Sequence, residues 1–101
     1  MNPLARMLLA SFRKPSSASV ETFTQHVTDL AAAGKLTAIE GTVLCASLSG
    51  ELNRDSISDQ AAEDIMICIQ TELEKLRLDQ AEKRSLHEEV LAVVKSAQQS
   101  A

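Results

Sequence analysis

Residues 58–76, SDQAAEDIMICIQTELEKL, carry the strongest structural signal in this 101-residue chain. Their apolar side chains recur every three or four positions, at Ala62, Ile65, Ile69, Leu73 and Leu76. At 100° per residue, these positions fall within an arc of about 80° on a helix surface. The pattern therefore predicts an amphipathic helix over 58–76 whose apolar stripe faces a core.

Two more amphipathic helices are predicted on either side of this stretch. One covers residues 79–96, where Asp79 and Glu82 have the spacing of a first-turn capping pair. The other covers residues 20–33, with Ser19 as its N-cap and Gly34 in the left-handed conformation that ends many helices. Both segments have apolar residues at helical spacing, so each is expected to pack one side against the core.

A further helix is predicted over residues 38–49. Thr37 and Glu40 form the capping-box pattern at its start, and Gly50 is expected to end it. The segment is apolar on two sides, one formed by Ile39, Val43 and Ala46 and the other by Leu44, Cys45 and Leu48. We therefore expect this helix to be the central and most buried one. Gly41 costs about 1 kcal/mol of helix propensity, although a glycine there would equally permit a close approach of a neighbouring helix.

The first 14 residues predict a short basic helix. Its apolar side is formed by Leu4, Leu8 and Phe12, while Arg6 and Arg13 lie opposite. A proline and a serine-rich run then interrupt the helical pattern. The expected organisation is a basic amphipathic leader and linker over 1–18, followed by a single helical-bundle domain over 19–101.

The composition supports an all-helical fold. Apolar residues make up 45% of the chain, but only two are aromatic, so aliphatic side chains must form the core. Three glycines and two prolines are too few for the tight turns of a β-sandwich or barrel. The predicted fold class is all-α: a compact four-helix bundle with an additional short basic N-terminal helix.

The charge distribution limits the possible partners. Before Glu21 there are three basic residues and no acid, whereas all fourteen acids, against seven basic residues, follow from Glu21 onward. Such an acidic body repels phosphate, so nucleic-acid binding is not expected.

The sequence contains no run of about 20 apolar residues, the length needed to span a bilayer. Cys45 and Cys68 lack metal or redox spacing and are predicted to be reduced, which fits a cytoplasmic protein.

No enzyme motif is present in the sequence. The only histidines, His26 and His87, have no His, Cys or carboxylate at a convincing ligand spacing. The chain also lacks a glycine-rich phosphate loop and a nucleophile elbow. We therefore predict no catalytic residues, no metal and no cofactor, and expect the protein not to be an enzyme.

The function that remains is protein–protein interaction, as an adaptor, chaperone, regulator or inhibitor. The predicted partner-binding residues are Leu4, Leu8 and Phe12 on the leader, together with Ile67 and Leu91, two aliphatic residues among polar ones on their helices. The partner is another protein or a second copy of the chain, which would give a homodimer. Three alternatives stay open for the leader: packing onto the bundle as a fifth helix, a role as a targeting signal, or contact with a membrane, which is not favoured.

One local pattern suggests a different class of function. Residues Ala46-Ser47-Leu48, Leu52 and Asp55-Ser56-Ile57 resemble the stretch of acyl and peptidyl carrier proteins that ends in Asp-Ser-Leu. The resemblance covers about a dozen residues and implies that Ser56 would carry phosphopantetheine at the start of an acidic recognition helix. The chain departs from the family pattern at Asn53-Arg54 and at Ser58-Asp59-Gln60. The alternative function that the resemblance implies is a carrier domain modified on Ser56.

Overall fold

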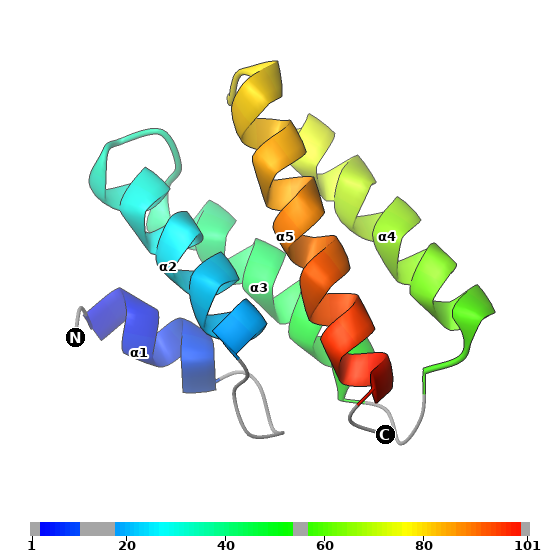
Figure 1. Cartoon of the computed structure of the whole chain (residues 1–101). Coiled ribbons are helices and arrows are strands. Elements are labelled where there is room, and N and C mark those ends of the chain that lie inside the picture. The colour runs from blue at the N-terminus through cyan, green and yellow to red at the C-terminus, as the bar shows by residue number, and fades with distance from the viewer. Residues whose placement is uncertain (1–2, 11–17, 54–56, 100–101) are drawn as a thin grey trace.

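The computed structural model describes residues 3–10, 18–53 and 57–99. Within these ranges it contains five helices and no strand: α1 (Pro3–Ala10), α2 (Ala18–Ala32), α3 (Ala38–Leu52), α4 (Asp59–Glu74) and α5 (Gln80–Gln99). Helices α2 to α5 run alternately up and down and pack in a ring, with α5 returning to lie beside α2 (Figure 1). The predicted all-α fold, a four-helix bundle with a short additional N-terminal helix, is confirmed.

The α4 stripe faces the core as its spacing predicts. Ile65, Ile69 and Leu73 are all buried. They pack within one aliphatic cluster that includes four residues of α5, Leu86, Val90, Val93 and Val94. The Ser58 hydroxyl accepts a hydrogen bond from the backbone N–H of Ala61 at 3.1 Å, so Ser58 is the N-cap of this helix.

The connection between α2 and α3 follows the local signals closely. Gly34 has φ +78°, and the N–H of Lys35 donates to the Leu30 carbonyl at 2.9 Å, which completes a left-handed helix stop. Three residues later, Thr37 and Glu40 exchange the two hydrogen bonds of a capping box, at 3.0 and 2.9 Å. The start of α2 differs from the prediction. The helix begins at Ala18, so Ser19 lies within it and is not its N-cap.

Two expectations about α3 were wrong. The helix does not end at Gly50 but continues to Leu52, because Leu52 is buried beside the core and stabilises an extra turn. Its second apolar side is not buried either: Ile39 is 76% exposed and Val43 is 49% exposed. The neighbours α1, α2 and α4 cover only one side of α3. The expected close approach is present, since a Cβ on Gly41 would lie 3.0 Å from Cγ1 of Val27 on α2.

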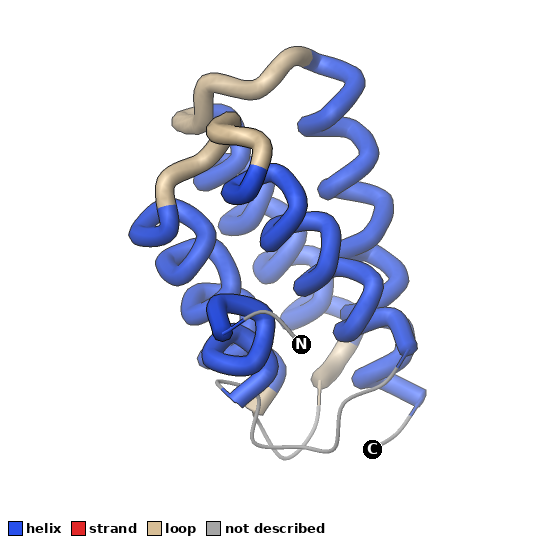
Figure 2. Tube along the Cα trace, turned by 90° about the vertical axis from the view of Figure 1, so that its left-hand side faces the viewer, coloured by secondary structure: helices blue, strands red, loops and turns tan. Residues whose placement is uncertain are grey.

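Helix α1 lies against α2 and α3, and Figure 2 views the bundle from this side. Leu8 is only 1% exposed and belongs to the main core, and Leu4 and Leu9 pack partly against it. Met7, which directly precedes Leu8, is 54% exposed. In this structure the leader therefore packs as a fifth helix, while Phe12 and the expected linker fall among residues 11–17, outside the described ranges.

The packing of α1 predicts that Leu8→Ala lowers the free energy of unfolding by about 2–4 kcal/mol, because it opens a cavity in an aliphatic core. Met7→Ala is the matched control on the same helix, and we expect it to change stability by no more than about 0.5 kcal/mol. Urea unfolding of the full chain measures both. Equal and small effects at the two positions would mean that α1 does not pack on the bundle in solution.

Candidate functional site

Two of the three leader residues predicted to bind a partner, Leu4 and Leu8, lie against the bundle. Leu8 is in the core and Leu4 packs partly against it, so the structure brings the two together on the inner side of α1. Phe12 lies outside the described residues. In this arrangement the apolar side of α1 is already used within the chain, and it offers little surface to a second protein.

The other sequence-predicted residues lie apart from one another. Ile67 on α4 is 58% exposed and Leu91 on α5 is 37% exposed, and both have polar neighbours on their own helices. Single exposed aliphatic side chains are common on protein surfaces. Ser56 lies outside the described residues, and the following helix takes Ser58 as its N-cap, so the carrier interpretation stays a prediction.

Two of the exposed large aliphatic side chains, Ile39 and Val43, lie on α3. We call the side of α3 that carries them the α3 outer face, and it consists of Ile39, Val43, Ala46 and Gly50, all exposed. The steps between them are four, three and four residues, so they lie in one row along the helix. No Lys or Arg occurs in α3, and its only charged residues are Glu40 and Glu51. The face is therefore an uncharged row about three turns long.

Sequence reasoning grouped Ile39, Val43 and Ala46 on one apolar side but expected that side to be buried. The available signal was the second apolar side itself, because a helix that is apolar all round must be covered on every side. A bundle of this size covers only one side of α3. The second apolar side therefore lies on the surface of the described structure rather than in its core.

A shallow groove runs between this face and α4. We call it the α3–α4 groove; its volume is about 180 Å³ and it is lined by Ile39, Glu40, Val43, Leu44, Glu72, Lys75 and Leu76. Within it, Nζ of Lys75 lies 3.4 Å from Oε1 of Glu72. Sites for small molecules are usually enclosed and about 300–1,000 Å³ in volume. A small open groove beside an apolar row suits side chains from a protein partner better.

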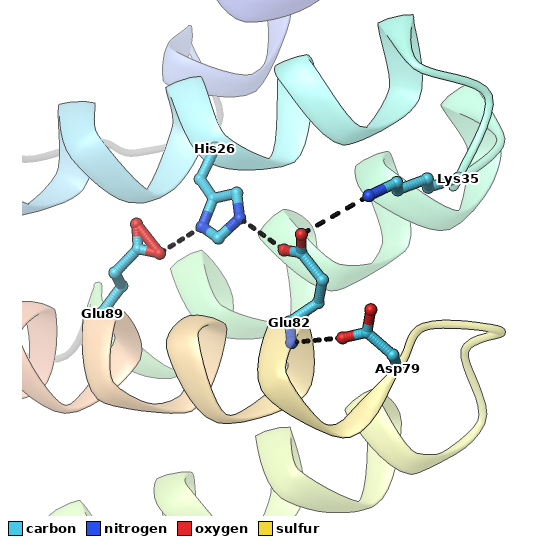
Figure 3. A network of polar contacts seen from close by, with 5 residues as sticks. All are labelled: His26, Lys35, Asp79, Glu82 and Glu89. Atoms are coloured by element: carbon cyan, nitrogen blue, oxygen red, sulfur yellow. Dashed lines mark hydrogen bonds and ion pairs between the residues drawn. The ribbon is translucent and has the colours of Figure 1, made fainter.

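A polar cluster joins α2 to α5 elsewhere on the molecule (Figure 3). His26 on α2 lies between two glutamates of α5, with Nδ1 hydrogen-bonded to Glu89 and Nε2 3.1 Å from Oε2 of Glu82. Nζ of Lys35 approaches the other Glu82 oxygen at 3.6 Å. Both ring nitrogens face carboxylate oxygens, and only the protonated imidazole has two N–H groups to donate to them. The geometry thus favours a charged His26.

The surroundings of His26 act on its pKa in opposite directions. Burial alone would lower the pKa, but the hydrogen bonds to Glu89 and Glu82 and their negative charges outweigh burial and raise it.

Glu82 also explains why the predicted capping pair at 79–82 is only half formed. Its N–H donates to Oδ1 of Asp79 at 2.8 Å, while its carboxylate reaches across to α2 (Figure 3).

This cluster connects two helices and has no free base. Both ring nitrogens of His26 are hydrogen-bonded to carboxylates, so neither is directed toward a substrate. Sequence spacing gave no sign of it, because His26 is 56 residues from Glu82 and 63 from Glu89. Only the antiparallel packing of α2 and α5 brings these residues together.

The remaining reactive groups show no constructed active site. Cys45 is buried, and burial raises the pKa of its thiol to about 12, which makes it a poor nucleophile. Cys68 is exposed on α4.

Across the described ranges, no three His, Cys, Asp or Glu side chains are grouped to hold a metal ion. No helix in those ranges has the length and apolar character needed to cross a membrane.

The raised pKa of His26 predicts a pH-dependent stability. A group with a folded-state pKa above its unfolded value stabilises fully below the unfolded pKa, about 6.5, and loses this contribution as pH rises through the folded value. We expect the free energy of unfolding of wild type to exceed that of His26→Gln most at about pH 5.5, and the gap to narrow toward about pH 9. Urea unfolding across this range measures it, and a gap that widens with pH would contradict the geometry.

Comparison of the chain with models of known protein families, with curated proteins and with solved structures finds no match. The case for a function therefore rests on the geometry of the α3 outer face and the α3–α4 groove.

Proposed function

We propose that this protein is a non-enzymatic protein-interaction module, acting as an adaptor, chaperone, regulator or inhibitor, and that it binds its partner through the α3 outer face. The observation that carries the proposal is the exposure of two large aliphatic side chains, Ile39 at 76% and Val43 at 49%, in one row on a helix without basic residues. The α3–α4 groove continues this apolar surface sideways, because Ile39 and Val43 also line it.

The free energy gained by burying aliphatic side chains favours a partner that covers this face. Burying a Val or Ile side chain completely is worth about 1.5–3 kcal/mol, so a partner that covers Ile39 and Val43 gains appreciable binding energy from few residues. A lone exposed aliphatic residue needs no such explanation, but a continuous apolar row beside an apolar groove is typical of interaction sites. Ile67 and Leu91 lie on different helices and do not line the α3–α4 groove, so we do not place the main contact there.

The test compares two double variants of the full chain. Wild type is first used to capture a partner from an extract of the source cells. We expect Ile39→Gln/Val43→Gln to bind this partner about thirtyfold more weakly in Kd, which is a loss of about 2 kcal/mol of binding free energy. Ile67→Gln/Leu91→Gln is the matched control, since it removes two other exposed aliphatic side chains and should keep the partner. Gln is a good helix former, so neither variant should alter the fold.

Thermal unfolding of both double variants provides the folding control, and each should remain within a few degrees of wild type. If the Ile67/Leu91 variant loses the partner while the Ile39/Val43 variant retains it, the proposed surface is wrong. Sedimentation of each chain alone then distinguishes a second copy from a different protein, because a homodimer would dissociate only in the variant that removes its contact.

A further inference from the structure

We infer that the partner segment is an amphipathic helix with an aliphatic edge and with Lys or Arg residues along the flank that lies over α4. This inference rests on the proposed function and adds the chemistry of the partner. It follows from the shape of the exposed surface and from the position of the acidic residues around it.

The shape of the surface favours a helix. From Ile39 to Gly50 the α3 outer face extends over 11 residues, which is about 16 Å along a helix axis. Its members have helical rather than extended spacing, and the α3–α4 groove lies between two helices packed side by side. Ridges of one helix fit into grooves of this kind, and recognition of an amphipathic helix is a common use of them. A partner helix of about three turns would cover the row.

The charge of the surface is one-sided. Helices α3 and α4 together contain seven acidic residues and no Lys or Arg: Glu40, Glu51, Asp59, Glu63, Asp64, Glu72 and Glu74. In contrast, α5 contains three acids balanced by three basic residues. Most of the acidic excess of the bundle therefore lies on α4, while α2 and α3 each contain two acids and no Lys or Arg.

Part of this acidity borders the apolar row directly. Glu40 and Glu72 line the α3–α4 groove together with one cation, Lys75, which pairs with Glu72 at 3.4 Å and leaves the acids in excess there. Asp64 and Cys68 precede Glu72 at steps of four residues, so the three form a row along α4 whose Glu72 end lies beside α3. The other acidic edge of α4 faces α5, because Glu74 lines a hollow with residues of that helix. Positive charge on the partner is therefore useful on one flank only.

A second copy of the chain fits this surface less well. An isologous dimer through the α3 outer face would use the same patch on both copies. In an antiparallel pairing of this kind, the acidic edges of both copies lie on the same side of the interface, where like charges oppose association. A cationic amphipathic helix instead satisfies the apolar row and the acidic edge together.

The direct probe is a synthetic amphipathic helix of about four turns with a leucine edge and lysines along one flank. A second peptide carries glutamates in place of the lysines. Titrated into the full-length chain and followed by calorimetry and by amide shifts, the leucine–lysine peptide should bind at α3 and α4, and the leucine–glutamate peptide at least about tenfold more weakly. Absence of binding by the leucine–lysine peptide overturns the inference.

A matched pair of charge variants tests the flank. Asp64→Lys/Glu72→Lys reverses the edge next to α3 and should reverse the preference between the two peptides. Glu63→Lys/Glu74→Lys makes the same change in net charge elsewhere on α4 and should leave the order of preference unchanged. An equal effect of both pairs would show diffuse attraction to an acidic protein and would overturn the inferred flank.

The peptide results also separate this inference from the proposed function. If both peptides bind wild type equally and Ile39→Gln/Val43→Gln abolishes both, the apolar surface stands and the basic flank is wrong. If Ile39→Gln/Val43→Gln binds both peptides as wild type does, the proposed surface fails as well. A concentration-dependent dimer that this variant abolishes would make a second copy the occupant and would overturn the choice of partner.

Discussion

A helix in a small bundle can bury only one of its sides, and α3 has two apolar sides. One of them holds Leu44, Leu48 and Leu52 in the aliphatic core. The other presents Ile39 and Val43 to solvent. Burying both would require another layer of protein, which the described helices do not supply. The proposed function is the simplest way to satisfy this constraint, since a partner would provide the missing layer.

The rest of the bundle holds α3 in a defined position. The capping box of Thr37 and Glu40 fixes its first turn, and Gly41 lets it approach Val27 of α2 closely. The cluster around His26 connects α2 to α5 and so closes the ring on the side away from the groove. A surface carried by a helix fixed in this way is largely formed before binding, which lowers the entropy lost on association.

The sequence predicted local features well and relationships between distant segments poorly. Helical spacing in α4, the left-handed Gly34 and the capping Thr37 depend on neighbouring residues, and the structure confirms all three. The link from His26 to Glu82 and Glu89 depends on which helices become neighbours, and no local pattern encodes that. For α3, periodicity identified both apolar sides but could not say which one lacked a neighbour. The same limit applies to α1, whose apolar side fits a core and a partner equally well until its packing is known.

The central claim is that a protein partner covers the α3 outer face. Site-specific photo-crosslinking tests it most directly, with a photoreactive side chain placed at position 39 of the full chain and, as a control, at position 67. Irradiation in an extract of the source cells should yield one discrete crosslinked protein from position 39 and none from position 67. Crosslinking from position 67 alone, or from neither position under conditions in which wild type retains its partner, would contradict the account.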